Sequence, residues 1–413
     1  MEKLRHNFQL LPATKQQAII KFSQVFTEAG YECFLVGGSC RDLLLGIEPN
    51  DFDFATNCPL PNTKKLFSKV IATGEPHGTL TVMLSGFQFE VTRYRKDIST
   101  DGRRAAISFA KTIEEDQARR DLRLNSLAYD VLADQIVDSQ KGIKDFEDKI
   151  VRFVGNAQDR ILEDHLRALR YGRMILILKP LGFGYLQDEL DQVGRVFDVK
   201  FLSLERLFDE LHKMLAIQAR DNEFFSKFLF DLRVFQGFCL NDQQTENVIK
   251  EVLASSSLLP LWYRYFKDHN LVDTAKIMRL SRSNKRLIQV LSEFESLDLT
   301  NDIVIKKLLY RAAELDRQIL SEAVECLFKQ EIQTRVQRII DKGDPIYVKD
   351  LSVDGNRLKR LGIEGRKIGL TLNYLLDKVW EQPQINQTET LMDMAAEYQK
   401  QLFGLIDQGP ISK

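Results

Sequence analysis

Two aspartates separated by one residue, Asp51 and Asp53, are the clearest chemical signal in the sequence. In a strand, residues i and i+2 face the same side, so the two carboxylates would share one exposed face while Phe52 and Phe54 face the core. Paired carboxylates repel each other unless a cation lies between them, and hard oxygen ligands suit Mg²⁺. Because an Asp-x-Asp pattern is also common in loops, the pair alone leaves a metal site and a solvated loop both open.

A glycine pair precedes the two aspartates. Residues 34–36 are apolar and β-prone, and Gly37 and Gly38 end that strand. Two glycines let the backbone approach a ligand closely and direct N–H groups at an anion. Arg41 adds a planar and permanently charged donor that suits phosphate. The segment therefore predicts a strand, a glycine turn, a short helix and a second strand, arranged to hold a phosphate group.

Residues 78–95 alternate between apolar and polar side chains around Ser85-Gly86, which predicts a β-hairpin. Glu90 lies on the polar face of its second strand. A carboxylate there is either part of a solvated strand face or a third ligand of the metal site that the aspartates suggest. Residues 96–109 are polar, basic and glycine-containing, and we expect a mobile loop that leads to a short strand.

Two further charged clusters follow. Arg119, Arg120 and Asp121 are predicted to begin a helix that runs through Tyr129. The arginines could bind a triphosphate and the aspartate could accept a hydrogen bond from a ribose hydroxyl, although a surface salt-bridge network would use the same residues.

The second charged cluster lies within residues 160–170, whose pattern predicts one continuous helix. On it Glu163, Arg167 and Arg170 would share a face and Asp164 would pair with Arg167. The pattern fits ordinary helix-stabilising ion pairs. It also fits recognition of a base, because Asp accepts hydrogen bonds, Arg donates them, and together they can read a Watson–Crick edge.

The remaining elements are mostly helical. An amphipathic helix is predicted over residues 14–29 and another helix over residues 62–72, and from about residue 143 the sequence is strongly helical to its end. Residues 340–350 contain a glycine and a proline and suit a joint before a final helical unit. Possible phosphate-contacting clusters in the helical part are Arg279, Arg282, Lys285 and Arg286, and then Arg357, Lys359, Arg360, Arg366 and Lys367.

Composition limits the classes of function. A chain of 413 residues is long enough for two to four domains, and 44% hydrophobic and 28% charged residues are ordinary for a globular protein. The net charge of -1 means that nucleic acid would have to bind to local basic patches. Five cysteines without a CxxC pair and scattered histidines argue against a zinc site and favour a reduced, cytoplasmic protein. No apolar run is long enough for a signal core or a membrane span.

Taken together and in this order, the motifs resemble those of class II tRNA nucleotidyltransferases, the bacterial CCA-adding type within the tRNA nucleotidyltransferase and poly(A) polymerase family. The resemblance covers nearly the whole chain. The matching segments are Leu35-Val36-Gly37-Gly38-x-x-Arg41-Asp42, Asp51-Phe52-Asp53, His77-Gly78-Thr79, Phe89-Glu90-Val91-Thr92, Asp101-Gly102-Arg103-Arg104, Arg119-Arg120-Asp121 with Asn125, Glu163-Asp164-x-x-Arg167, and in the tail Asp350-Leu351, Gly355, Gly362, Gly365, Ile368-Gly369 and Asn386.

The resemblance implies an α+β fold, in which a nucleotidyltransferase head with a mixed β-sheet precedes all-α neck, body and tail domains. We expect the catalytic head at 1–142, a neck that recognises the nucleotide base at 143–210, a helical body at 211–335 and a tRNA-binding tail at 336–413.

The implied activity is template-independent addition of CCA to the tRNA 3′ end from CTP and ATP, with release of pyrophosphate. The implied metal ligands, which are also the catalytic residues for two Mg²⁺ ions, are Asp51, Asp53 and Glu90. The implied nucleotide-binding residues are Gly37, Gly38, Arg41, Arg120, Asp121, Asn125, Glu163, Asp164, Arg167 and Arg170. The implied partner is the acceptor stem and T-arm of tRNA, with neither a membrane nor a protein partner.

Some positions depart from the family's pattern. Arg123 interrupts the usual Phe-Thr-Ile/Met-Asn run, and Lys141-Gly142 stands where a Gly-Gly is typical of the connector after the head. Because loop and connector govern the change from CTP to ATP, an enzyme that adds only CC or only A is an alternative. A poly(A) polymerase and an inactive RNA-binding relative are the others.

Overall fold

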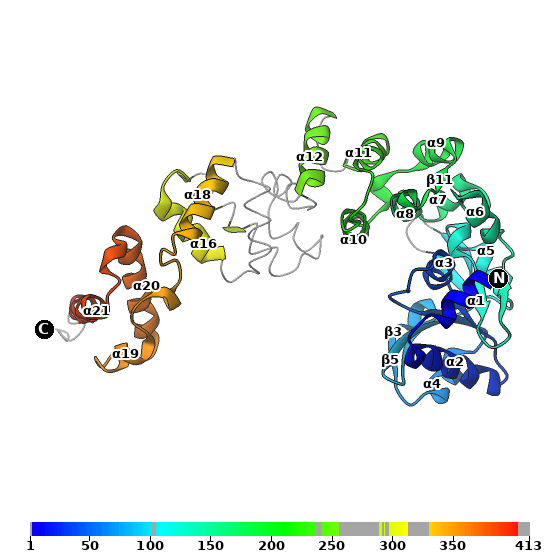
Figure 1. The fold of residues 1–413 in the computed structure, drawn as a ribbon, viewed down its shortest axis with the longest axis horizontal. Helices are drawn as coiled ribbons and strands as arrows, with labels where there is room; N and C mark the ends of the chain where they lie inside the picture. The colour runs from blue at the N-terminus through cyan, green and yellow to red at the C-terminus, as the bar shows by residue number, and fades with distance from the viewer. Residues whose placement is uncertain are drawn as a thin grey trace, which may run out of the picture. The chain divides into compact units, whose positions relative to one another are not determined.

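The computed structural model describes residues 2–100, 105–235, 242–255, 289–290, 293, 297–312 and 330–403. The chain forms two compact units, Met1–Leu253 and Ala254–Lys413 (Figure 1). The first unit contains the β-sheet and the helices that follow it, and the described part of the second unit is helical. No helix among the described residues is long and apolar enough to cross a membrane.

A seven-stranded sheet forms the head of the first unit, in the order β3-β4-β5-β2-β1-β8-β9. Strands β2 and β5 run parallel, and every other neighbouring pair is antiparallel, which confirms the predicted mixed sheet. The strands are β1 (Cys33–Val36), β2 (Asp53–Thr56), β3 (Val70–Gly74), β4 (Thr79–Leu84), β5 (Phe87–Arg93), β8 (Ala128–Asp130) and β9 (Gln135–Val137). Two small ribbons add β6 (Arg95–Thr100) with β7 (Ala105–Phe109), and β10 (Ile150–Val151) with β11 (Gly184–Tyr185).

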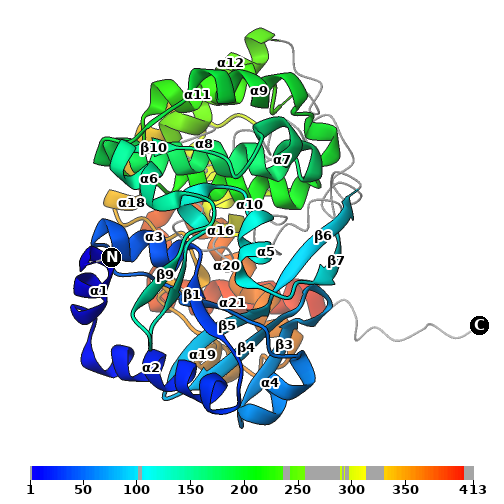
Figure 2. The same cartoon turned by 90° about the vertical axis from the view of Figure 1, so that its right-hand side faces the viewer.

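Helices cover the sheet and then continue above it. Figures 1 and 2 both show the green helices α8 to α11 above the blue strands of the head. The helices of this unit are α1 (Glu2–Gln9), α2 (Ala13–Glu28), α3 (Gly38–Leu45), α4 (Leu60–Leu66), α5 (Ile113–Ala118), α6 (Gly142–Asp148), α7 (Ala157–Glu163), α8 (Leu166–Leu178), α9 (Gln187–Val196), α10 (Leu204–Leu215) and α11 (Asn222–Asp231), with α12 (Asp242–Ser255) at its end. Short 3₁₀ turns are η1 (Glu75–His77), η2 (Arg123–Asn125), η3 (Lys179–Leu181) and η4 (Val199–Phe201).

The second unit packs its helices around a separate core that includes Leu375, Val379 and Leu391. Its described elements are α16 (Asp302–Ala312), α18 (Gln330–Asp341), η6 (Val348–Asp350), α19 (Gly355–Lys359), α20 (Arg366–Glu381), η7 (Pro383–Ile385) and α21 (Thr388–Phe403).

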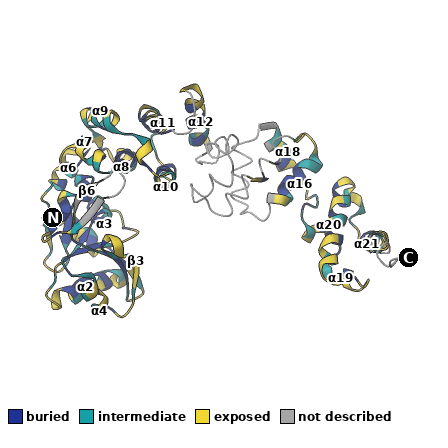
Figure 3. Ribbon diagram, turned by 180° about the vertical axis from the view of Figure 1, so that it is seen from behind, coloured by how far each residue is buried: buried dark blue, intermediate teal, exposed yellow. Residues whose placement is uncertain are grey.

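Aromatic side chains fill the core on one side of the head sheet. The ring of Phe22 from α2 lies 4.5 Å from that of Phe54 and 4.9 Å from that of Phe89. Phe52 is buried as well, as the alternation around the aspartates predicted. In Figure 3 the interior of the head is coloured as buried, whereas the edge strand β3 contains exposed residues. Because Phe54 and Phe89 point into this core, their neighbours Asp53 and Glu90 are directed to the other face of the sheet.

The predicted helix over 14–29 is confirmed by α2, and the predicted hairpin over 78–95 is confirmed by β4 and β5. The predicted helix over 62–72 is wrong after Leu66, because residues 70–74 form β3 at the sheet edge and pair with β4. In the segment 96–109, the predicted short strand is confirmed by β7. The first residues of the expected loop are not a loop, because they form strand β6, which pairs with β7.

Two helix predictions around charged residues are wrong. Helix α5 ends at Ala118, and Arg119 and Arg120 fold back onto Asp116 instead of starting a helix; the chain then enters β8 and pairs with β1. The expected single helix over 160–170 is broken at Asp164, whose φ of -157° and ψ of 107° are extended. Helical spacing in the sequence could not reveal this break, since the residues on either side of it are helical.

Candidate active site

One cavity of about 690 Å³ in the first unit brings the candidate residues together. All of the predicted catalytic and nucleotide-binding residues line it except Glu163, which contacts the lining residue Arg167. The cavity is lined by Val36, Gly37, Gly38, Arg41, Asp51, Asp53, Phe54, Glu90, Thr92, Arg95, Arg119, Arg120, Asp121, Asn125, Asp164, Leu166, Arg167, Arg170, Arg173, Met174, Arg206 and Lys213.

The glycine turn between β1 and α3 forms one wall. Gly37 has φ 72° and ψ -137°, a conformation that side chains with a Cβ rarely adopt. A Cβ at this position would lie 3.4 Å from Arg120 Nη1 and 3.8 Å from Asp53 Oδ2. The backbone at Gly37 therefore approaches both the arginine and the carboxylate closely, and its role in binding phosphate stays a prediction.

Asp53 and Glu90 are paired by the register of the parallel strands β2 and β5. Burial raises the pKa of Asp53 to about 6, and the negative charges of Glu90 and Asp51 add to the increase while Arg120 opposes it. Asp51 and Glu90 are exposed and line the same cavity. The arrangement gathers three carboxylates in the lining of the cavity, and Arg120 lies near enough to Asp53 to lower its pKa in part.

These carboxylates suit a divalent cation by their chemistry. They offer hard oxygen donors, and a nearby cation would remove the repulsion that contributes to the raised pKa of Asp53. Within the described ranges, no three His, Cys, Asp or Glu side chains are already gathered into a metal-binding cluster. Asp53 and Glu90 therefore form the core of the candidate site, and Asp51 lines the same cavity.

Ser39 fixes the relationship between the glycine turn and the aspartates. Its hydroxyl donates to the Asp51 carbonyl at 3.0 Å and accepts from the Asp53 backbone N–H at 3.2 Å. Ser39 is buried, so these two bonds satisfy its hydroxyl as both donor and acceptor. Ser39 stands at an unspecified position of the Gly38-x-x-Arg41 motif, so its sequence pattern gave no signal of this role.

Asp116 on α5 anchors two arginines. Its Oδ1 lies 2.7 Å from Arg119 Nη2, and its Oδ2 lies 3.0 Å from Arg120 Nη2. Burial opposes ionisation of Asp116, but the charges of Arg120 and Arg119 outweigh that effect and lower its pKa. A buried ion pair of this kind directs both guanidinium groups toward the cavity.

Asn125 links the same segment to the glycine turn. Its side-chain oxygen accepts from Arg41 Nη1 at 2.9 Å, and its backbone carbonyl accepts from Arg120 Nη1 at 3.3 Å. Arg41, Arg120 and Asn125 are therefore held as one connected group on the wall of the cavity.

Asp121 connects the head to α8. Its carboxylate accepts from Arg170 Nε at 2.5 Å and from the Leu122 backbone N–H at 2.8 Å. Burial would raise the pKa of Asp121, but Arg170 and these hydrogen bonds lower it to about 2. Asp121 is therefore ionised at neutral pH and holds Arg170 at the cavity.

Glu163, Asp164 and Arg167 lie around the break between α7 and α8. Arg167 Nη1 is 2.5 Å from Glu163 Oε2, and Arg167 Nη2 donates to the Arg119 carbonyl at 3.0 Å. Among the described residues the ion-pair partner of Asp164 is Arg206, at 2.7 Å, and not Arg167 as predicted.

The structure adds cations to the cavity that sequence reasoning missed: Arg95, Arg173, Arg206 and Lys213. Arg206 and Lys213 are seven residues apart on α10, a spacing that puts both on one helix face. That spacing was the available signal, but nothing local showed which surface the face would meet.

The remaining predicted clusters are not among the described residues that line this cavity. Asp101-Gly102-Arg103-Arg104 and the cluster from Arg279 to Arg286 fall outside the described residues. In the second unit, Lys359, Arg360, Arg366 and Lys367 are exposed, whereas Arg357 donates to the Ser352 carbonyl at 2.9 Å and so supports the local fold.

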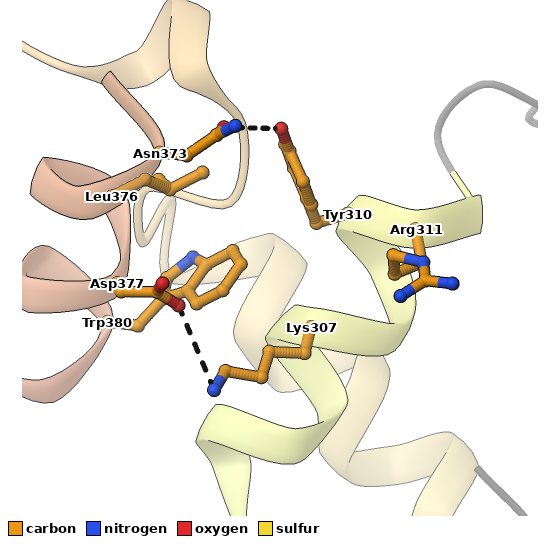
Figure 4. Close-up of a pocket in the computed structure, with 7 residues that line it drawn as sticks. All are labelled: Lys307, Tyr310, Arg311, Asn373, Leu376, Asp377 and Trp380. Carbon is orange, nitrogen blue, oxygen red and sulfur yellow. Dashed lines mark hydrogen bonds and ion pairs between the residues drawn. The ribbon is translucent and has the colours of Figure 1, made fainter. Parts of the chain in front are cut away.

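A second cavity, of about 250 Å³, lies between α16 and α20 (Figure 4). Tyr310 donates to the Asn373 side chain at 2.9 Å, and Lys307 lies 3.8 Å from Asp377. Its lining is Lys307, Tyr310, Arg311, Asn373, Leu376, Asp377 and Trp380. With one carboxylate in that lining, this cavity does not repeat the paired carboxylates of the first.

Comparison with known proteins agrees with this geometry. Residues 33–152 match the model of the poly A polymerase head domain. A CCA-adding enzyme of Streptococcus mutans is 41% identical over 170 residues, which are 41% of this chain and 41% of that relative, so the match spans less than half of the relative's length. A CCA-adding enzyme of Streptococcus thermophilus is 26% identical over 402 residues, which are 92% of this chain and 96% of the relative.

Two solved structures share the fold. The CCA-adding enzyme of Bacillus stearothermophilus in complex with CTP has a TM-score of 0.65 at 21% identity and covers 95% of this chain and 99% of that chain. The Thermotoga maritima CCA-adding enzyme complexed with tRNA_CCA has a TM-score of 0.64 at 15% identity and covers 96% and 98%. The chain is therefore similar to CCA-adding enzymes over most of its length, and its residues 33–152 match the poly A polymerase head domain.

Proposed function

We propose that this protein adds the 3′-terminal CCA to tRNA without a nucleic-acid template, using CTP and ATP. The observation that carries the proposal is that one cavity holds both the carboxylates Asp53 and Glu90 and the base-reading candidates Asp164 and Arg167. A nucleotide whose phosphates lie at the first pair could thus present its base to the second. The names of the relatives and the CTP and tRNA_CCA complexes of the similar structures support the same activity.

In the proposed reaction the tRNA 3′-hydroxyl oxygen attacks the α-phosphorus of the nucleotide. A phosphodiester bond forms, the bond between the α- and β-phosphates breaks, and pyrophosphate leaves. Asp53 and Glu90, with Asp51, would hold Mg²⁺, which supplies charge neutralisation for the phosphates and lowers the pKa of a bound hydroxyl.

The chain's own cations complete the phosphate site. Gly37 and Gly38 would bring backbone N–H groups to the triphosphate, as a turn with a left-handed glycine allows. Arg41 and Arg120 would bind its oxygens, because both are already fixed on the cavity wall through Asn125. Positioning and charge stabilisation of this kind account for most of the catalysis of phosphoryl transfer.

Recognition of the sugar and base would use other residues that line the same cavity, together with Asn125. Asp121, Asn125 and Arg170 would contact the ribose, and Asp164 and Arg167 would face the base edge. Cytosine and adenine both carry an amino group where uracil and guanine carry a carbonyl oxygen, so a carboxylate acceptor suits the two correct bases.

We further propose the division of the chain into a head (1–142), neck (143–210), body (211–335) and tail (336–413). The exposed cations Lys359, Arg360, Arg366 and Lys367 of the tail would contact RNA phosphates. Recognition by backbone shape and charge is typical of A-form RNA.

The test is extension of labelled tRNA transcripts that end before the first C or after CC, and of an oligomer unrelated to tRNA. Each is incubated with Mg²⁺ and CTP, ATP or both. The expected result is addition of CCA that requires both nucleotides and a tRNA. Arrest after CC would support partial activity, and long A tails on any RNA would support a poly(A) polymerase.

The variants Asp53→Ala and Glu90→Ala should abolish incorporation. Asp188→Asn is the matched control, because Asp188 is an exposed carboxylate on α9 that does not line the cavity. RNA binding without incorporation by the wild type would refute the enzymatic proposal in favour of a binding protein.

A further inference from the structure

We infer that Arg206 is a specificity-determining positioning residue, which holds the Asp164 carboxylate in the orientation that selects the base. This inference rests on the proposed function and extends it to a residue outside the motifs that suggested it. Arg206 lies on α10, far along the chain from the break between α7 and α8 where Asp164 lies.

The first step is the state of Asp164 itself. It lies at the C-terminal end of α7 in an extended conformation, so the regular geometry of a helix does not fix its side chain. Its Oδ1 accepts from the Leu166 backbone N–H at 3.1 Å, and its Oδ2 lies 2.7 Å from Arg206 Nη2. The two contacts together define the plane of the carboxylate, and the remaining lone pairs can still accept from a ligand.

The second step is that the neighbouring residue is held by the same stretch of chain. His165 is buried, and its ring stacks on that of Phe201 with centroids 4.5 Å apart and an angle of 8° between the planes. The backbone N–H of Asp198 donates to His165 Nδ1 at 3.1 Å. Residues 198–206 thus contact both His165 and Asp164, and fix the break between the helices at two points.

The third step is the rigidity of the element that carries Arg206. Ser203 caps α10 by accepting the backbone N–H of Arg206 at 3.4 Å. Further along α10, the buried carboxylate of Glu210 forms an ion pair with Arg173 of α8. Arg206 is therefore presented from a helix that is attached to α8, the helix that also carries Arg167 and Arg170.

The consequence is a difference in selectivity between nucleotides. With its orientation fixed, Asp164 accepts from the amino group shared by cytosine and adenine and repels the carbonyl oxygen of uracil and guanine. Without Arg206 the carboxylate can rotate, and the selection weakens. If Arg206 instead bound phosphate directly, its loss would lower kcat/KM equally for all four nucleotides.

The experiment measures kcat/KM for single additions of CTP, ATP, UTP and GTP to the appropriate tRNA transcripts. The variants are Arg206→Ala, Arg206→Lys, Asp164→Ala and the double variant. Arg195→Ala on α9 is the matched control, because Arg195 is exposed and does not line the cavity. Lysine keeps the charge but lacks the planar fork of arginine, so it separates charge from geometry.

We expect Arg206→Ala to reduce the preference for CTP over UTP and for ATP over GTP by at least about tenfold, with Arg206→Lys restoring only part of it. The double variant should discriminate no worse than Asp164→Ala, because Arg206 acts through Asp164. Equal loss for all four nucleotides, or additive effects in the double variant, would overturn the inference.

Failure of the proposed function gives a different result. In that case the wild type itself adds neither nucleotide to tRNA, whereas failure of this inference leaves an active wild type whose selectivity does not depend on Arg206.

Discussion

Asp53 and Glu90 face each other as register partners of β2 and β5, the one parallel pair in the seven-stranded sheet. This pairing puts two carboxylates from distant parts of the chain on the same face of the sheet. Burial and the charge of Glu90 raise the pKa of Asp53 to about 6. The site therefore carries an electrostatic strain that a bound cation would relieve.

The variant Asp53→Asn should be more stable than the wild type without divalent cations, and at least about 100-fold less active. The pKa of Asp53 is higher in the folded state than in the unfolded state, so protonation of Asp53 stabilises the fold. This stabilisation is fully present at pH values below the unfolded pKa of about 4, and it is lost as the pH rises through the folded pKa of about 6. In thermal unfolding, the Tm of Asp53→Asn should exceed that of the wild type by more at about pH 8 than at about pH 5. Asp188→Asn is the control, and a lower Tm for Asp53→Asn at both pH values would contradict this account.

Mg²⁺ binding to the wild type should weaken as the pH falls below about 6, because protons compete with the cation for Asp53. The measurement is the increase in Tm that Mg²⁺ causes, recorded across this pH range. The increase should shrink toward acid pH in the wild type and be small at every pH in Asp53→Asn. A constant increase in both proteins would place the cation elsewhere.

Replacement of Ser39 by alanine should lower kcat by about tenfold or more and leave KM for CTP nearly unchanged. The variant leaves the Asp51 carbonyl and the Asp53 N–H without the partner that now positions them. An unsatisfied buried polar group costs about 1–3 kcal/mol of unfolding free energy. Ser23→Ala is a matched control, since Ser23 is also a buried serine but lies on α2 and does not line the cavity. Equal losses in the two variants would show that Ser39 has no special role.

Local patterns in the sequence predicted much of this arrangement. Alternation around Phe52 and Phe54 identified the core side of β2, and the glycine pair identified the turn before α3. These features depend on neighbouring residues, which is why the sequence reveals them.

Features that depend on the order of strands and the packing of helices were not predictable. Asp53 and Glu90 become register partners only because β5 lies beside β2 in the sheet. Asp164 and Arg206 form an ion pair only because α10 packs against α8. The charged residues near Asp164 fit a helix equally well, so their spacing concealed the break that exposes the carboxylate.

The connector after the head offers a last test of a departure seen in the sequence. Lys141 has a left-handed backbone with φ 64° and ψ 34° at the start of α6, at the position where the resemblance led us to expect glycine. A left-handed conformation costs a residue with a Cβ about 1–2 kcal/mol. Replacement by glycine would remove this cost, but the greater freedom of glycine in the unfolded chain would offset part of the gain in unfolding free energy.

Lys141→Gly should therefore raise the unfolding free energy by roughly 0.5–1 kcal/mol, as measured by urea denaturation. The matched control is Lys144→Gly within α6, where glycine should destabilise by about 1 kcal/mol. The adjacent Gly142 cannot be exchanged in this way, because a Cβ there would lie 2.4 Å from the Arg123 carbonyl oxygen. If Lys141→Gly destabilised the protein as much as Lys144→Gly, contacts of the Lys141 side chain would have to outweigh its backbone strain.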